Sequence, residues 1–89
     1  MKPVKLPIED NLDLHTFQPK EMPDLLGGYF SACIEARIFE VRIIHGKGKG
    51  VLRKRLHGLL DRNPWVSSFK TAPPEAGGWG ATLVKLKHH

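Results

Sequence analysis

Cysteine is almost absent from this chain of 89 residues, since Cys33 is the only one. A single cysteine excludes an internal disulfide and a zinc site built mainly from thiolates. This composition fits a reducing compartment, so we expect a cytoplasmic protein. His88 and His89 match the end of a purification tag, and we give them no chemical role.

Long apolar runs are also missing. No stretch approaches the ~20 residues that a membrane-crossing helix requires. The first residues, Met1-Lys-Pro-Val-Lys-Leu-Pro7, lack the apolar core of a signal peptide. With 40% hydrophobic and 26% charged residues, the chain has the composition of one small globular domain. We therefore expect no membrane partner, and we assume a monomer because nothing in the sequence forces association.

Acidic residues are scarce in the second half of the chain. Residues 1–40 hold four Lys/Arg and seven Asp/Glu, whereas residues 41–89 hold ten Lys/Arg and two Asp/Glu. The two balances are −3 and +8, within a net charge of +5. A basic half of this kind favours a polyanionic partner such as nucleic acid, although a solvated basic face would have the same composition.

Hydrophobic spacing predicts alternating strands and helices within residues 11–87, preceded by an extended arm at residues 1–10. A short alternating segment and three longer ones, rich in β-branched residues, predict strands at 12–15, 39–44, 66–72 and 81–86. Apolar residues at helical spacing predict one helix from the Pro19–Pro23 region to about Arg37, and a second that ends at Asn63-Pro64.

Two glycines lie inside the first predicted helix, Gly27 and Gly28. Each costs on the order of 1 kcal/mol of helix stability relative to alanine. The helix therefore needs tertiary packing, or the close approach of another backbone at the glycines. The sequence does not decide between the two.

The element order β-α-β-α-β-β predicts an α/β fold, a two-layer sandwich with a four-stranded mixed sheet and both helices on one face. Right-handed crossovers make the first three strands parallel, and the short loop before the last strand makes it antiparallel. Functional sites in such sheets lie at the carboxyl ends of the parallel strands. This edge would collect His15 from the first strand and His45 from the second.

A glycine-rich loop, His45-Gly-Lys-Gly-Lys-Gly50, joins the second predicted strand to the second predicted helix. It brings backbone N–H groups, lysine charge and the positive end of a helix together, which favours an anion. The loop matches neither the P-loop nor the dinucleotide fingerprint. A tight turn would also use glycine at positive φ, but three glycines with two lysines exceed what a turn needs. We therefore predict phosphate binding by Gly46, Lys47, Gly48, Lys49 and Gly50.

Basic and aromatic residues follow this loop. Arg53, Lys54 and Arg55 spread over roughly 200° of helix, so only one or two of them, Arg53 and Lys54 by our assignment, would contact phosphate. His57 is interpreted as an ordinary helix residue. Trp79, in a second glycine-rich loop, is suited to stack on an unpaired base, although covering the end of the core is the more ordinary role of such a residue.

Asp13, His15 and His45 are the candidate catalytic residues. Residues 13 and 15 project on the same side of a strand, so the carboxylate can orient the imidazole and favour its protonated form. One imidazole would act as base on water or a 2′-hydroxyl, while the other, or a lysine, would stabilise charge or protonate the leaving oxygen. Either histidine could instead cap a strand end. These residues have no metal-ligand spacing, so we assign no metal site, and Mg²⁺ is neither required nor excluded.

Three motifs together resemble the Smr (small MutS-related) domain: Leu12-Asp-Leu-His15, Ile44-His-Gly-Lys-Gly48 with Leu52-Arg53, and Gly80-Ala-Thr82. The resemblance covers about residues 10–87 and suggests a short stand-alone member of bacterial type. It implies the same two-layer fold and nucleic-acid binding. Several members are endonucleases that nick DNA or cleave RNA, some of them on ribosome-bound messages. The first motif places Leu12, Asp13 and His15 at the site, and the second places His45, Gly46 and Gly48 there.

The sequence departs from the first motif at Thr16, where the family usually has glycine. A side chain there could narrow the site, which affects cleavage more than binding. Two functions therefore stay open, an endonuclease acting on RNA or DNA and a non-catalytic module that binds nucleic acid or the ribosome. A third, weaker alternative is a protein–protein adaptor that uses the Trp79 loop.

Overall fold

The computed structural model describes residues 10–14, 17–46 and 50–87. The predictions for the N-terminal arm, for His15 and Thr16, and for Lys47, Gly48 and Lys49 lie outside these residues.

The described elements follow the predicted order. The strands are β1 (Asn11–Asp13), β2 (Glu40–Ile44), β3 (Val66–Thr71) and β4 (Ala81–Leu86), and the helices are α1 (Met22–Glu35) and α2 (Val51–Arg62). Short 3₁₀ turns lie at Pro19–Glu21, Pro74–Ala76 and Gly78–Gly80. The β-α-β-α-β-β reading is confirmed, with β1 and α1 slightly shorter than predicted.

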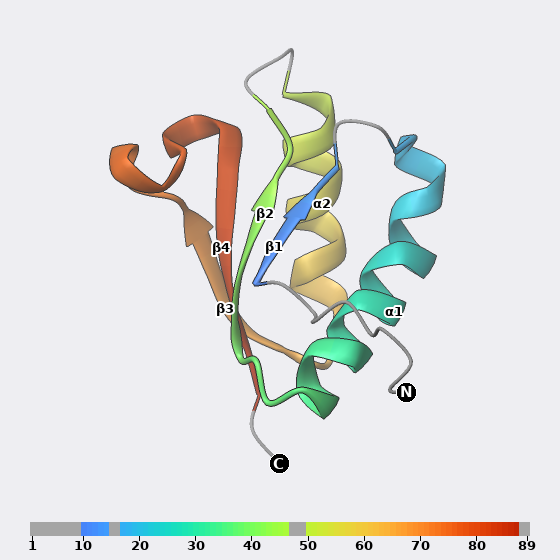
Figure 1. Ribbon diagram of the computed structural model, residues 1–89. Helices are drawn as coiled ribbons and strands as arrows, with labels where there is room; N and C mark the ends of the chain where they lie inside the picture. Colours follow the sequence, from blue (N-terminus) through green and yellow to red (C-terminus); the bar gives the residue numbers. More distant parts are fainter. Residues whose placement is uncertain (1–9, 15–16, 47–49, 88–89) are drawn as a thin grey trace, which may run out of the picture.

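The four strands form one mixed sheet in the order β1-β2-β4-β3. β1 pairs with β2 in parallel, and β4 runs antiparallel to both β2 and β3. The first three strands therefore run in one direction, as predicted. The last strand inserts between β2 and β3, so it lies in the middle of the sheet (Figure 1).

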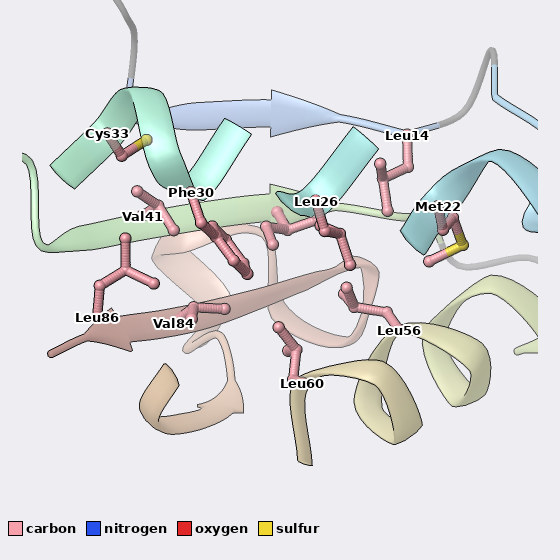
Figure 2. Close-up of a cluster of buried hydrophobic side chains, with 11 residues drawn as sticks. Leu14, Met22, Leu26, Phe30, Cys33, Val41, Leu56, Leu60, Val84 and Leu86 are labelled. Carbon is pink, nitrogen blue, oxygen red and sulfur yellow. The ribbon is translucent and has the colours of Figure 1, made fainter. Parts of the chain in front are cut away.

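Both helices cover one face of the sheet and enclose the core with it (Figures 1 and 2). Alternate residues of the two central strands point toward the helices, because side chains alternate along a strand. The buried apolar cluster takes residues from four elements (α1, β2, α2 and β4) and from the segment after β1: Leu14, Met22, Leu26, Phe30, Cys33, Val41, Ile43, Leu56, Leu60, Val84 and Leu86. This arrangement leaves the opposite face of the sheet to Arg42, Ile44 and their neighbours.

Helix α1 is held by packing and not by a close backbone approach at its glycines. Gly27 and Gly28 are exposed, and a Cβ added to either would meet nothing within 4 Å. The opposite side of the helix buries Met22, Leu26 and Phe30 in the core. Burial of this face therefore offsets the poor helix propensity of the glycines.

Neither helix of the described part combines the length and the apolar character that crossing a membrane requires.

Candidate nucleic-acid site at the end of the central strands

The candidate site begins where β2 ends. The backbone N–H groups of His45 and Gly46 both donate to the Gly80 carbonyl, at 3.0 and 2.9 Å. Gly80 is buried and immediately precedes β4, so this shared acceptor fixes the exit of β2 to the entrance of β4. Gly46 has a φ of 83°, which explains a glycine at this position.

The His45 ring is buried on the helix side of the sheet. Only 5% of the residue is exposed, and it continues the buried series of Val41 and Ile43. Nδ1 lies 3.1 Å from the Gly46 carbonyl oxygen, and Nε2 lies 2.9 Å from the Thr82 hydroxyl oxygen. Both ring nitrogens are thus used inside the protein, which differs from the free acid or base that the sequence suggested.

His57 forms a polar cluster with His45 and Thr82, and the sequence-based interpretation of His57 as an ordinary helix residue missed this contact. Its Nε2 lies 2.8 Å from the Thr82 hydroxyl oxygen that also contacts His45. The His57 ring lies edge-on to His45, with centroids 6.4 Å apart, and to Phe69, with centroids 5.0 Å apart. His57 follows Arg53 by four residues, and this spacing on one helix face was the signal available in the sequence.

Both imidazoles are shifted toward their neutral form. Burial lowers the pKa of His45 below its ordinary value of 6.5, and the charge of Arg53 acts in the same direction, while the hydrogen bond to Gly46 opposes them. Burial also lowers the pKa of His57, followed by the charges of Arg53 and His45. The two imidazoles are therefore neutral at neutral pH, and the positive charge beside them is that of Arg53.

Arg53 reaches from the first turn of α2 across to the loop before β4. Its guanidinium carbon lies 4.0 Å from the centroid of the Trp79 ring, and Nη2 donates to the Thr71 hydroxyl at 2.9 Å. Its Nε is buried and has no hydrogen-bond partner among the described residues. Trp79 is 54% exposed, so it carries the guanidinium on its ring and does not close the core.

The start of α2 adds backbone donors at the same end of the sheet. Gly50 precedes the helix with a φ of 78°, and as a glycine it has no side chain with which to cap the first turn. The free N–H groups of a first turn attract anions. Of the basic residues here, Arg53 is half-buried, whereas Lys54 and Arg55 are exposed, so Arg53 alone is built into the described cluster.

Asp13 lies beside β2 but on the other face of the sheet. It pairs with Ile44 in the parallel register, whereas Leu12 pairs with buried Ile43. Neighbouring residues of parallel strands share a face, so Asp13 points away from the face that buries His45. The structure does not join these two residues, and His15 lies outside the described part.

No group of three or more His, Cys, Asp and Glu side chains within residues 10–14, 17–46 and 50–87 is arranged to hold a metal ion.

The comparisons with known proteins agree on one family. The model of the Smr domain matches residues 12–87. Endonuclease MutS2 of Thermomicrobium roseum is 36% identical over 80 residues, which is 90% of this chain and 10% of that protein. Ribosome rescue factor SmrB of Erwinia tasmaniensis is 37% identical over 76 residues, which is 85% of this chain and 42% of that protein. The chain thus spans about a tenth of the length of the MutS2 relatives that it matches.

Two solved structures have the same fold. The Smr domain of Thermus thermophilus MutS2 superposes with a TM-score of 0.81 at 32% identity, covering 86% of this chain and 96% of that chain. YdaL of Escherichia coli, a stand-alone small MutS-related protein, gives a TM-score of 0.80 at 26% identity, covering 88% of this chain and 64% of that chain.

Proposed function

Because this chain belongs to the Smr domain family, we propose that it binds nucleic acid where the glycine-rich loop meets α2 and cleaves phosphodiester bonds at the adjoining edge of the sheet, where β1 and β2 end. The names of its relatives support both parts, since one is an endonuclease and another a ribosome rescue factor. The second name makes RNA on the ribosome a candidate partner.

The arrangement of Arg53 is the observation that carries the binding proposal. The guanidinium is held between Thr71 and the ring of Trp79, and its buried Nε has no partner among the described residues. A planar guanidinium presents a fork of donors suited to a phosphate. The exposed part of Trp79 is suited to stack on an unpaired base, so we propose that single-stranded nucleic acid is preferred.

Electrostatics and the loop sequence point to the same place. The first turn of α2 offers free N–H groups, and Lys54 is exposed next to Arg53. Lys47, Gly48 and Lys49 precede this turn in the sequence, and their predicted role in phosphate binding stays part of the proposal.

We assign proton transfer during cleavage to Asp13 and His15, the pair predicted from the first motif. His45 was predicted as a second imidazole, but both of its ring nitrogens are hydrogen-bonded within the protein. We therefore give His45 the role of orienting the glycine-rich loop. The same observation favours the alternative function, a non-catalytic module that binds nucleic acid or the ribosome.

The binding test compares Arg53→Met with Arg62→Met, which removes the same charge from the exposed far end of α2. Affinity for a labelled single-stranded RNA is measured by mobility shift. We expect Arg53→Met to weaken binding about tenfold, as loss of a charge-assisted contact implies, and Arg62→Met to change it less than twofold. Equal effects of the two substitutions would contradict a site at Arg53.

The cleavage test incubates the parent protein with single-stranded RNA and with supercoiled plasmid, with and without Mg²⁺. Asp13→Asn and His15→Ala should remove cleavage and retain most of the binding. A parent protein that shifts RNA in a salt-sensitive way and cuts neither substrate would replace the nuclease with the binding module.

A further inference from the structure

We propose that His57, Thr82 and His45 form one directional hydrogen-bond chain that ends on the Gly46 carbonyl, which makes His57 and Thr82 positioning residues for the glycine-rich loop. The chain joins three elements, because His57 lies on α2, Thr82 on β4, and His45 directly after β2. Its consequence for cleavage rests on the function proposed above, whereas its existence and direction do not.

The direction follows from what each group can donate. A carbonyl oxygen only accepts, so Nδ1 of His45, 3.1 Å from the Gly46 carbonyl, carries a proton. A neutral imidazole has one N–H, so Nε2 of His45 must accept, and the Thr82 hydroxyl 2.9 Å away must donate to it.

The remaining link is then determined. The Thr82 hydroxyl has one proton, and it donates this proton in the hydrogen bond to His45. The Thr82 oxygen must therefore accept the hydrogen bond from His57, at 2.8 Å. His57 is therefore the tautomer with its proton on Nε2. His57 thus donates to Thr82, Thr82 donates to His45, and His45 donates to the Gly46 carbonyl.

The surroundings keep both rings neutral, which this direction requires. Arg53 on α2 is a cation that acts on both imidazoles, and His57 also lies in the field of His45. Phe69 on β3 places an apolar ring against His57, with centroids 5.0 Å apart. A proton on either ring would thus meet a nearby positive charge.

The chain has a mechanical result at the loop. The Gly46 N–H donates to the Gly80 carbonyl at 2.9 Å, and the Gly46 carbonyl accepts from His45. Both backbone groups of Gly46 are thus fixed: its N–H by the Gly80 carbonyl just before β4, and its carbonyl by the hydrogen-bond chain through His45. Thr82 is 0% exposed, and valine would fill nearly the same volume, so its hydroxyl serves the two histidines and not the packing.

The primary test is an NMR spectrum of the parent protein labelled with ¹⁵N-histidine, recorded at neutral pH. We expect His45 protonated on Nδ1 and His57 protonated on Nε2. His45 protonated on Nε2 would overturn the proposal, and this result needs neither a variant nor any activity.

The matched variants are Thr82→Val, which removes the hydroxyl, and Thr82→Ser, which retains it. Thr82→Ser should keep the parent tautomers, whereas Thr82→Val should shift the His45 Nε2 signal and mix the tautomers of both rings. An unchanged histidine spectrum in Thr82→Val would contradict the chain.

Activity supplies a separate readout. If the parent cleaves RNA, Thr82→Val should lower kcat at least tenfold with little change in KM, and Thr82→Ser should restore it. A parent protein that cuts nothing would refute the nuclease proposal. The histidine tautomers would then decide alone whether the hydrogen-bond chain exists. Full kcat in Thr82→Val would show that the chain does not position the loop for cleavage.

Discussion

At the scale of single residues, left-handed backbone conformation occurs both with and without glycine. Gly46 and Gly50 have φ values of 83° and 78°, whereas Arg37 has a φ of 60°. Arg37 follows α1, where its N–H bonds to the Ile34 carbonyl and the Ile38 N–H bonds to the Cys33 carbonyl. This pair of bonds is a Schellman motif, in which the left-handed position usually carries glycine.

We predict that Arg37→Gly stabilises the domain. A non-glycine residue in the left-handed region costs roughly 1–2 kcal/mol. Glycine removes this cost, but it also raises the entropy of the unfolded chain, which offsets part of the gain. The free energy of unfolding from urea denaturation should rise by about 0.5–1 kcal/mol. Arg37→Ala is the control, since it removes the side chain and keeps the backbone cost. An equal gain in Arg37→Ala would assign the effect to the side chain.

The opposite change is expected at the loop. A Cβ on Gly46 would meet nothing within 4 Å, so Gly46→Ala is limited by its φ of 83° alone. We expect a loss of about 1–2 kcal/mol in the free energy of unfolding, together with weaker RNA binding. A Gly46→Ala protein as stable as the parent would show that the loop can leave the left-handed region.

At the scale of elements, α1 contains two glycines that its packing does not require. Gly27 and Gly28 are exposed and have open space where a Cβ would lie. Gly27→Ala and Gly28→Ala should each raise the free energy of unfolding by about 0.5–1 kcal/mol. The two substitutions should also leave RNA affinity unchanged, because neither glycine belongs to the site formed by Arg53, Thr71 and Trp79. Destabilisation by either would mean that this helix side has a contact beyond the described residues.

The elements themselves were predictable, because their apolar spacing is regular and glycine and proline mark their ends. The strand at 81–86 and the end of α2 before Asn63-Pro64 agree with the structure residue by residue. The insertion of β4 between β2 and β3 was not predicted, since a hairpin fixes only the pairing with β3. This insertion brings Thr82 beside His45.

The site was predictable only in part, because the position of β4 in the sheet was not predicted. His45, Gly46 and Arg53 lie together because the chain places them around one loop. His57 needed Thr82 from a distant strand before its polar contact became visible. Asp13 shares the edge of the sheet with His45, but the register with Ile44 puts its side chain on the other face.

At the scale of the whole molecule, two histidines, the buried His45 and the half-buried His57, make stability depend on pH. Burial lowers the pKa of His45 and His57 below the ordinary 6.5, so the unfolded chain takes up protons before the folded domain does. Their contribution is complete above about pH 6.5 and is lost as pH falls toward the lowered folded values. The urea midpoint should therefore drop between pH 7 and pH 5. His57→Gln should show a shallower drop, and an equally steep one would assign the dependence to other groups.

Salt separates the general charge of the basic half from the site at Arg53. The residues after position 40 carry a balance of +8, and such a surface attracts nucleic acid without a defined site. Each phosphate contact on a single strand contributes a slope of about −0.7 to log K against log salt. A plot for the parent therefore counts contacts, while variants show which residues make them.

We predict that Arg53→Met makes this slope less negative by about 0.7 to 1, the loss of one phosphate contact. Arg62→Met, with the same change in net charge, should leave the slope as it is. The guanidinium at Arg53 is held by Thr71 and Trp79, so it meets a phosphate without first being ordered. Trp79→Ala should therefore weaken binding through the lost ring and a less ordered Arg53, with only a small change in slope. If both arginine variants alter the slope equally, RNA is held by the diffuse charge of the basic half.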